Sequence, residues 1–150
     1  MSKPELLTQP TFLLDVNVML ALFDPVHLHH AIVRDWYANG LRAIASCPLS
    51  ELGFVRICSN PRYPNPLDSP EQALALLRAL HAEKRHTFWP DDVSLADKAF
   101  SLQPFRTHRE TTDRYLLRLA VHRSGQLLTL DAGIKPADPV ERAALCLLAA

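Results

Sequence analysis

The sequence predicts an α/β fold, with a central, mostly parallel sheet of four to five strands flanked by helices. Short apolar runs bounded by Gly, Pro or Asp alternate along the chain with longer segments of helical periodicity. Buried parallel strands and the helices between them show this alternation. The length of 150 residues and the hydrophobic fraction of 48% suit one ordinary domain with a real core. We therefore expect a single domain over residues 1–150.

Four short apolar runs are the predicted strands. They cover residues 11–14, 41–45, 86–89 and 126–130. The first ends at Asp15, the third is closed by Pro90, and the fourth ends at Asp131. The tail has two interpretations: Asp138-Pro139 could start a helix, and residues 145–148 could form a last edge strand.

Helical patterns fill the intervals between these runs. Residues 32–37 indicate a helix that ends before Gly40, and residues 49–58 indicate one with Glu51 in its first turn. Ser69-Pro70-Glu71-Gln72 reads as a capping box ahead of leucines at helical spacing, and Ser94 with Asp97 is a weaker version of it. Thr111 or Thr112 caps a later helix, and Gly125 stands at its stop. Three prolines within residues 60–66 predict a stiff surface loop.

Composition excludes several classes of protein. The chain has 16 basic and 16 acidic residues, which argues against a nucleic-acid coat or a disordered acidic tail. No apolar run approaches the roughly 18–20 residues of a membrane span, and the N-terminus does not resemble an export signal. The three cysteines are odd in number and widely spaced, as expected for reduced thiols. We expect a cytoplasmic protein without membrane association.

Acidic residues stand where a parallel sheet places its functional sites. Asp15 and Asp131 directly follow predicted strands, and the carboxyl ends of such strands border the ligand-binding crevice. Asp113 begins the helix that leads into the last of these strands, and Glu51 lies early in the helix after the second. We therefore expect the four carboxylates to converge at one edge of the sheet.

Such a convergence requires a counter-charge. Two carboxylates about 4 Å apart repel by roughly 4 kcal/mol at an effective dielectric constant near 20. A hard divalent cation such as Mg²⁺ prefers oxygen ligands and relieves this repulsion. Because a bound cation also activates water and neutralises phosphoryl oxygens, the pattern favours metal-assisted phosphodiester chemistry.

Four segments, taken in order, carry a family resemblance. They are Leu13-Leu14-Asp15-Val16-Asn17-Val18, Pro48-Leu49-Ser50-Glu51-Leu52, Thr112-Asp113-Arg114-Tyr115-Leu116 and Leu128-Thr129-Leu130-Asp131. Their order and spacing resemble the successive motifs of PIN-domain ribonucleases, in particular the VapC-type toxins of bacterial toxin–antitoxin pairs. The resemblance spans residues 12–134. Each motif alone is weak, but four in order with matching intervals are fairly specific.

The resemblance implies a PIN-like three-layer α/β/α sandwich and an endoribonuclease that depends on Mg²⁺ or Mn²⁺. The implied catalytic residues and metal ligands are Asp15, Glu51, Asp113 and Asp131, supported by Asn17 and Thr129. In this family a metal-activated water hydrolyses RNA and leaves a 5′-phosphate and a 3′-hydroxyl. The resemblance also implies a homodimer and a cognate VapB-type antitoxin that inserts near the site.

Basic residues crowd the approach to Asp113. Arg106, Arg109 and Arg114 are candidate RNA contacts, and a solvated basic surface is the equal alternative. Setting aside the four acids of the site leaves 12 acids against 16 bases, a net charge of +4 for the rest of the chain. The sequence thus predicts a mildly basic surface around one acidic pocket.

Two other functions are weighed against this one. A PIN-like module without catalysis could bind RNA or protein, but the full acidic quartet argues against it. A phosphotransfer domain with Asp15 as nucleophile would need a second nearby Asp or a Lys near the later strand ends, and neither is present. The histidines at 27, 29 and 30 lack partners at zinc-site spacing, so we interpret them as a solvated helix face.

Overall fold

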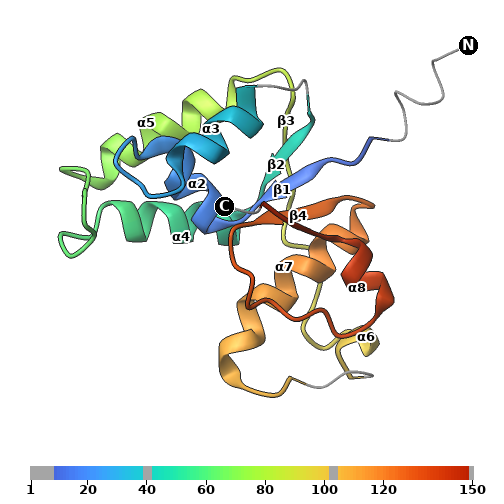
Figure 1. Cartoon of the computed structure of the whole chain (residues 1–150). Coiled ribbons are helices and arrows are strands. Elements are labelled where there is room, and N and C mark those ends of the chain that lie inside the picture. Colours follow the sequence, from blue (N-terminus) through green and yellow to red (C-terminus); the bar gives the residue numbers. More distant parts are fainter. Residues whose placement is uncertain (1–8, 39–41, 102–104, 149–150) are drawn as a thin grey trace, which may run out of the picture.

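The computed structural model describes residues 9–38, 42–101 and 105–148 of the chain (Figure 1). The strands are β1 (Phe12–Leu14), β2 (Ile44–Ser46), β3 (His86–Phe88), β4 (Gln126–Thr129) and β5 (Leu145–Leu147). The helices are α2 (Val16–Phe23), α3 (His30–Ala38), α4 (Pro48–Cys58), α5 (Pro70–His81), α6 (Lys98–Ser101), α7 (Thr111–His122) and α8 (Pro139–Ala143), with a 3₁₀ turn η1 (His108–Glu110). The predicted helix stop at Gly40, the first residue of the predicted second strand and the N-terminal segment lie outside the described residues.

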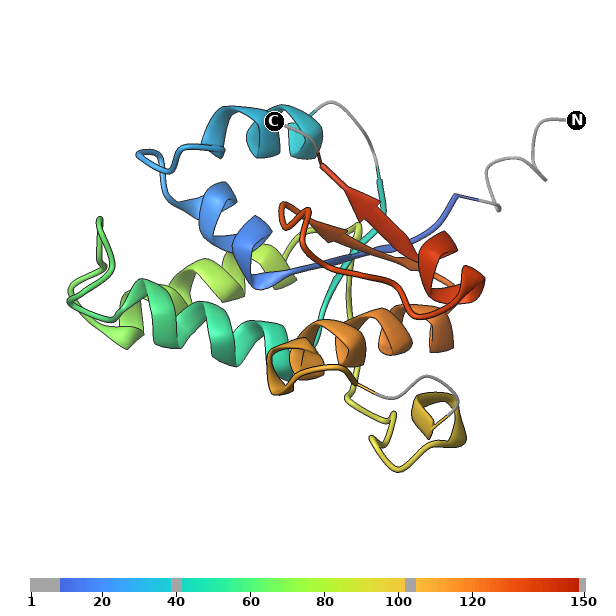
Figure 2. The ribbon, with the colours of Figure 1, turned by 60° about the horizontal axis from the view of Figure 1, so that its bottom comes forward.

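The five strands form one parallel sheet in the order β3-β2-β1-β4-β5. Every predicted strand is present in shorter form; β2 shares only Ile44 and Ala45 with its predicted run and ends one residue later, at Ser46. Both interpretations of the tail hold at once: Asp138 caps α8, and β5 follows as the edge strand beside β4 (Figure 2). The predicted fold class is therefore confirmed.

Successive strand residues face opposite sides of the sheet and pack in two separate cores. Leu14, Ile44 and Leu128 belong to the core covered by α2, α3, α4 and α5. Their neighbours in sequence belong to the core on the other face, against α7; these are Leu13, Ala45 and Leu127. Figure 1 shows the two groups of helices on either side of the sheet, which makes the three layers of the expected sandwich.

Helix boundaries differ from the sequence predictions in their capping. The helix after Ser69 begins as predicted, but the Ser69 side chain makes no capping hydrogen bond. The Gln72 side chain instead accepts a hydrogen bond from the backbone N–H of Asp68 at 2.9 Å, so the reciprocal capping box is absent. For α7, a threonine cap was expected, whereas η1 leads directly into the helix and Glu110 occupies the N-cap position.

The C-terminal end of α7 is a Schellman turn. Ser124 adopts the left-handed conformation, with φ of 56°. Its N–H donates to the Val121 carbonyl, and the N–H of Gly125 donates to the Ala120 carbonyl at 2.8 Å. Gly125 is required for a different reason from the expected one: a Cβ there would lie 2.5 Å from the Thr11 carbonyl oxygen and 2.7 Å from the Trp89 ring.

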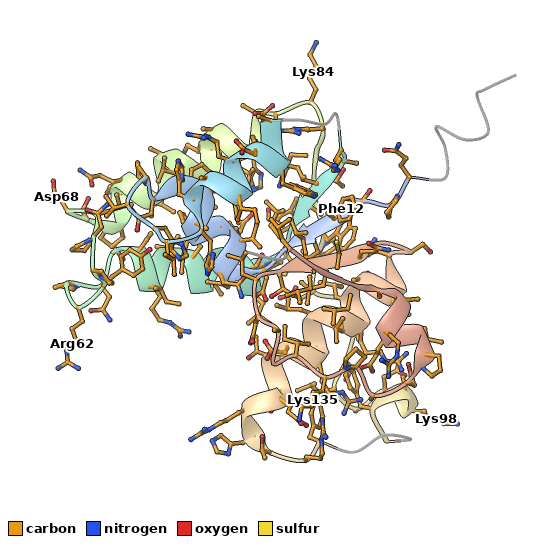
Figure 3. All side chains as sticks on the ribbon, viewed as in Figure 1. Phe12, Arg62, Asp68, Lys84, Lys98 and Lys135 are labelled. Carbon is orange, nitrogen blue, oxygen red and sulfur yellow. The ribbon has the colours of Figure 1, made fainter. Side chains whose placement is uncertain are left out.

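The proline-rich segment joins α4 to α5 and has no helix or strand, as predicted. Figures 1 and 2 both show this loop at the end of the two helices that lies away from the sheet, and Figure 3 shows Arg62 projecting from it. Because α4 ends at Cys58, the loop lies about 10 Å along the helix axis beyond Glu51. Among the described residues, no helix is long and apolar enough to cross a membrane.

Candidate active site

The predicted site lies where the order of the strands reverses. From β1 the chain adds β2 and then β3 on one side, whereas β4 and β5 pair on the other. In parallel sheets the crevice outside the carboxyl ends of the strands at such a switch point binds ligands. Asp15 follows β1, and Asp131 follows its direct neighbour β4 by two residues.

Asp15 is held rigidly at the start of α2. Its side chain is only 6% exposed and accepts a hydrogen bond from the Val16 N–H at 2.7 Å, as the N-cap of the helix. Its other oxygen accepts a hydrogen bond from Thr129 Oγ1 at 2.8 Å. Burial raises the pKa of Asp15, and the charge of Asp131 adds to this rise, while the hydrogen bonds oppose it.

Thr129 and Asn17 link the ends of the two central strands. The Asn17 amide donates to Thr129 Oγ1 at 3.2 Å and accepts from the Leu130 N–H at 3.1 Å. Thr129 Oγ1 also accepts from the Asp131 N–H at 3.1 Å. The two residues therefore position Asp15 and the turn that carries Asp131.

Asp113 supplies a third carboxylate from the first turn of α7. Burial raises the pKa of Asp113 to about 6, and the charges of Asp15 and Asp131 contribute to the rise. Asp131 itself is exposed, and its Oδ1 accepts a hydrogen bond from the Gly133 N–H at 2.8 Å. Three acids from three separate elements thus share one electrostatic environment, as expected at this edge of the sheet.

The chemistry of these three donors fits a hard divalent cation. The set offers carboxylate oxygens, which are the ligands that Mg²⁺ and Mn²⁺ prefer. Burial and the charges of Asp15 and Asp131 raise the pKa of Asp113, and a bound positive charge opposes that rise because it favours the ionised carboxylate. The site therefore suits a metal ion better than it suits three ionised acids alone.

Glu51, the fourth predicted acid, points to different partners. It lies in the first turn of α4, as predicted. Its Oε2 accepts a hydrogen bond from Ser46 Oγ at 2.6 Å and lies 2.6 Å from His81 Nε2. The structure thus brings together three acids of the predicted quartet and turns the fourth toward β2 and α5.

Two histidines beside Glu51 were missed by the sequence analysis. His81 is the last residue of α5 and His86 the first of β3. Their rings lie 4.3 Å apart between centroids, and His86 Nε2 lies 2.8 Å from Ser46 Oγ. Burial lowers the pKa of His86, and His81 lowers it further. The signal available in the sequence was the spacing of the two histidines, because four intervening residues fall within a common metal-ligand spacing.

The three candidate RNA-contacting arginines have different environments. Arg109 is exposed, and Arg106 is exposed with its guanidinium 3.1 Å from Glu110. Arg114 is only 3% exposed, pairs with the buried Glu141 and packs against the Phe105 ring at 4.6 Å. The expectation that Arg114 contacts RNA is therefore corrected: its guanidinium joins α7 to α8 inside the fold.

Comparison with known proteins agrees with this geometry. The family model of the PIN domain matches residues 12–138. Ribonuclease VapC38 of Mycobacterium tuberculosis strain H37Rv is 42% identical over 136 residues, which cover 86% of this chain and 95% of the relative. Ribonuclease VapC39 of the same strain is 40% identical over 83% of this chain and 91% of its own length. Ribonuclease VapC44 is 41% identical over 81% and 87% respectively.

The family-model match spans both central strands and all four predicted acids, and each relative covers most of the chain. The chain belongs to the PIN-domain family and is a VapC-type member of it. The resemblance first noted in four short motifs is thereby confirmed.

Proposed function

We propose that this chain is a divalent-metal-dependent endoribonuclease that acts as the toxin of a toxin–antitoxin pair. The observation that supports the proposal is that Asp15, Asp113 and Asp131 follow or begin three elements beside the switch point of the sheet, with the charges of Asp15 and Asp131 acting on Asp113. The relatives at 40–42% identity are named ribonucleases, which supports RNA as the substrate.

Asp15, Asp113 and Asp131 would hold Mg²⁺ or Mn²⁺. The family resemblance implies that Glu51 joins them, which would require its carboxylate to leave Ser46 and His81. When bound, the cation supplies charge neutralisation at the phosphoryl oxygens and lowers the pKa of water, so that water hydrolyses the bond. The expected products carry a 5′-phosphate and a 3′-hydroxyl.

The other residues of the site position the acids and the substrate. Thr129 holds one Asp15 oxygen through its hydroxyl, which leaves the carboxylate little freedom to rotate. Arg106 and Arg109 precede Asp113 by less than two helical turns, on the exposed segment around η1. We assign them to the phosphates of RNA, where cations bind without sequence preference.

We further propose that the chain acts as a single domain in the cytoplasm, as a homodimer neutralised by a VapB-type antitoxin. The unpaired state of Cys47, Cys58 and Cys146 agrees with a reducing compartment. Co-expression tests this part: growth arrest by this chain should be relieved by its upstream partner.

Replacing Asp15 with Asn tests the catalytic assignment. We expect Asp15→Asn to lower RNA cleavage in Mg²⁺ by at least about 100-fold, the cost of removing one group that stabilises the transition state. Asp35→Asn is the matched control, since Asp35 is an exposed acid on α3. Undiminished cleavage by Asp15→Asn would contradict the proposal.

Metal binding separates the proposal from its alternative, a PIN-like module that binds RNA or protein without catalysis. Mg²⁺ or Mn²⁺ at 100 times its dissociation constant should stabilise the protein by about 2.7 kcal/mol. Stabilisation accompanied by cleavage supports the nuclease. Stabilisation without cleavage of any RNA tested would favour the binding module.

A further inference from the structure

Glu51, His81 and His86 bring three metal-binding side chains together outside the trio of aspartates. One ligand atom from each lies within 4.8 Å of the others. The residues come from three elements, namely the first turn of α4, the last residue of α5 and the first residue of β3. The fold itself therefore gathers them.

The donor set indicates the kind of ion. Two imidazoles and one carboxylate form the His₂Glu combination that binds Zn²⁺ with a fourth position open to water. Imidazole nitrogen favours late first-row transition metals, whereas Mg²⁺ favours oxygen alone. Metal–ligand bonds of about 2.1 Å place tetrahedral ligands about 3.3 Å apart. The three ligand atoms, which lie within 4.8 Å of one another, are therefore close to the spacing that a tetrahedral site requires.

Neighbouring residues fix the position of the three side chains of this cluster and leave one of them accessible to solvent. Ser46 is 0% exposed and anchors it, because its Oγ donates to Glu51 and lies 2.8 Å from His86 Nε2. His81 is 39% exposed and provides a path for an ion from solvent. Lys84, in the turn between the two histidines, projects away from the molecule (Figure 3). Its positive charge therefore does not face the cluster.

We propose that Glu51, His81 and His86 form a second metal site, for Zn²⁺ or another late transition-metal ion, and that an ion bound there keeps Glu51 out of the acidic site. Glu51 has one carboxylate, and its observed partners are Ser46 and His81. The inhibitory consequence rests on the proposed nuclease function, whereas ion binding does not. Because binding linkage is reciprocal, Zn²⁺ and Mg²⁺ weaken each other by the same factor.

Calorimetric titration with Zn²⁺ at pH 7.5 tests the site on the full chain. We expect His81→Gln and His86→Gln each to weaken Zn²⁺ binding by at least about tenfold. His122→Gln is the matched control, since His122 also ends a helix and lies 3.6 Å from an acid, Asp92. If His81→Gln and His86→Gln both bind Zn²⁺ as tightly as the wild type does, the proposed second metal site is overturned.

Repeating the titration in saturating Mg²⁺ tests the sharing of Glu51. We expect the zinc affinity of the wild type to fall at least about tenfold, within the range of typical coupling between sites. Zinc affinity that is independent of Mg²⁺ overturns the proposal that Glu51 serves both sites.

Cleavage assays then test inhibition. In Mg²⁺ with micromolar Zn²⁺, we expect the wild type and His122→Gln to lose activity and His81→Gln to retain it. Equal inhibition of all three proteins overturns the regulatory role. Absence of cleavage in zinc-free Mg²⁺ would contradict the proposed function alone, because calorimetry still decides whether the two ions compete.

Discussion

In the absence of a bound metal, the ionised carboxylate of Asp113 is destabilised by burial and by the nearby negative charges. Burial and the charges of Asp15 and Asp131 raise the pKa of Asp113 to about 6, from an ordinary value near 3.8. A raised pKa means that the folded protein binds this proton more tightly than the unfolded chain does. Ionised Asp113 therefore destabilises the fold fully above about pH 6 and has no such effect below about pH 4.

Replacing Asp113 with Asn should consequently stabilise the metal-free protein. We expect a gain of the order of 1 kcal/mol at pH 8, discounted for partial exposure of the side chain, measured by urea unfolding in EDTA. The gain should vanish near pH 4, where Asp113 is protonated in both states. The same variant should lose most of the stabilisation by Mg²⁺. A loss of stability at pH 8 would show that the charge is already compensated within the protein.

At the scale of single residues, the sequence predicted the positions of some site residues but not the direction of every side chain. The positions of Asp15 and Asp131 were predictable because the end of a strand fixes the backbone of the one or two residues that follow it, whatever their rotamers. The direction of the Glu51 carboxylate depends on Ser46 and His81, which are distant enough in sequence to escape local patterns. Arg114 had a readable signal: it precedes the buried Leu117 by three residues, so both lie on one helix face.

Among the helices, α8 is fastened to α7 by an ionic network. Glu141 is 0% exposed, and its Oε2 accepts hydrogen bonds from Arg114 at 3.3 Å and Arg118 at 2.8 Å. Its Oε1 accepts from the Ala137 N–H at 3.0 Å. Removing one member of a buried ionic network leaves the other charges uncompensated. The network therefore holds the tail that adds β5 to the sheet.

Replacing Glu141 with Ala should destabilise the protein by about 3–5 kcal/mol, the usual cost of breaking a buried ion pair. Urea unfolding at pH 7 measures the change. Glu71→Ala is the control, because Glu71 is exposed in the first turn of α5 and its loss should cost no more than about 0.5 kcal/mol. Equal stabilities of the two variants would mean that α8 is held by its apolar contacts alone.

At the C-terminal end of α7, we predict that substitutions at two adjacent residues change the stability of the protein in opposite directions. Ser124→Gly should stabilise the protein by about 0.5–1 kcal/mol, because glycine adopts the left-handed conformation without a Cβ penalty. Gly125→Ala should destabilise it by about 1–3 kcal/mol, because the new methyl group collides with the Thr11 carbonyl and Trp89. Thermal unfolding measures both. If Gly125→Ala is neutral, strand β1 has room to shift against α7.

The helices and strands differ in how well the sequence predicts them. The strands could be predicted from short apolar runs bounded by Gly, Pro or Asp, but α2 was not predicted. Four consecutive residues of α2, from Val18 to Ala21, are buried, so the helix lacks a polar face and shows no helical periodicity. Its start is set instead by Asp15, whose side chain caps the helix by accepting a hydrogen bond from the Val16 N–H.

For the whole molecule, charge is segregated although the net charge is zero. The acids of the site converge at the carboxyl ends of the central strands, while Arg106 and Arg109 lie exposed just before α7. An RNA phosphate approaching Asp113 meets both signs of charge. Under the proposed function, a bound cation would therefore assist RNA binding as well as chemistry, since it would remove the repulsion between phosphate and carboxylates.

Arg109 should contribute to RNA affinity through charge alone. We expect Arg109→Ala to weaken RNA binding uniformly across sequences and to reduce the slope of log affinity against log salt by about 0.7, the value for one phosphate of a single strand. Fluorescence anisotropy in Mg²⁺, in an Asp15→Asn background to prevent cleavage, measures the slope. Arg34→Ala is the control, because Arg34 is 59% exposed on α3, on the far side of the sheet from α7. A slope unchanged by Arg109→Ala but reduced by Arg34→Ala would move the RNA path from the start of α7 to the opposite layer of the sandwich.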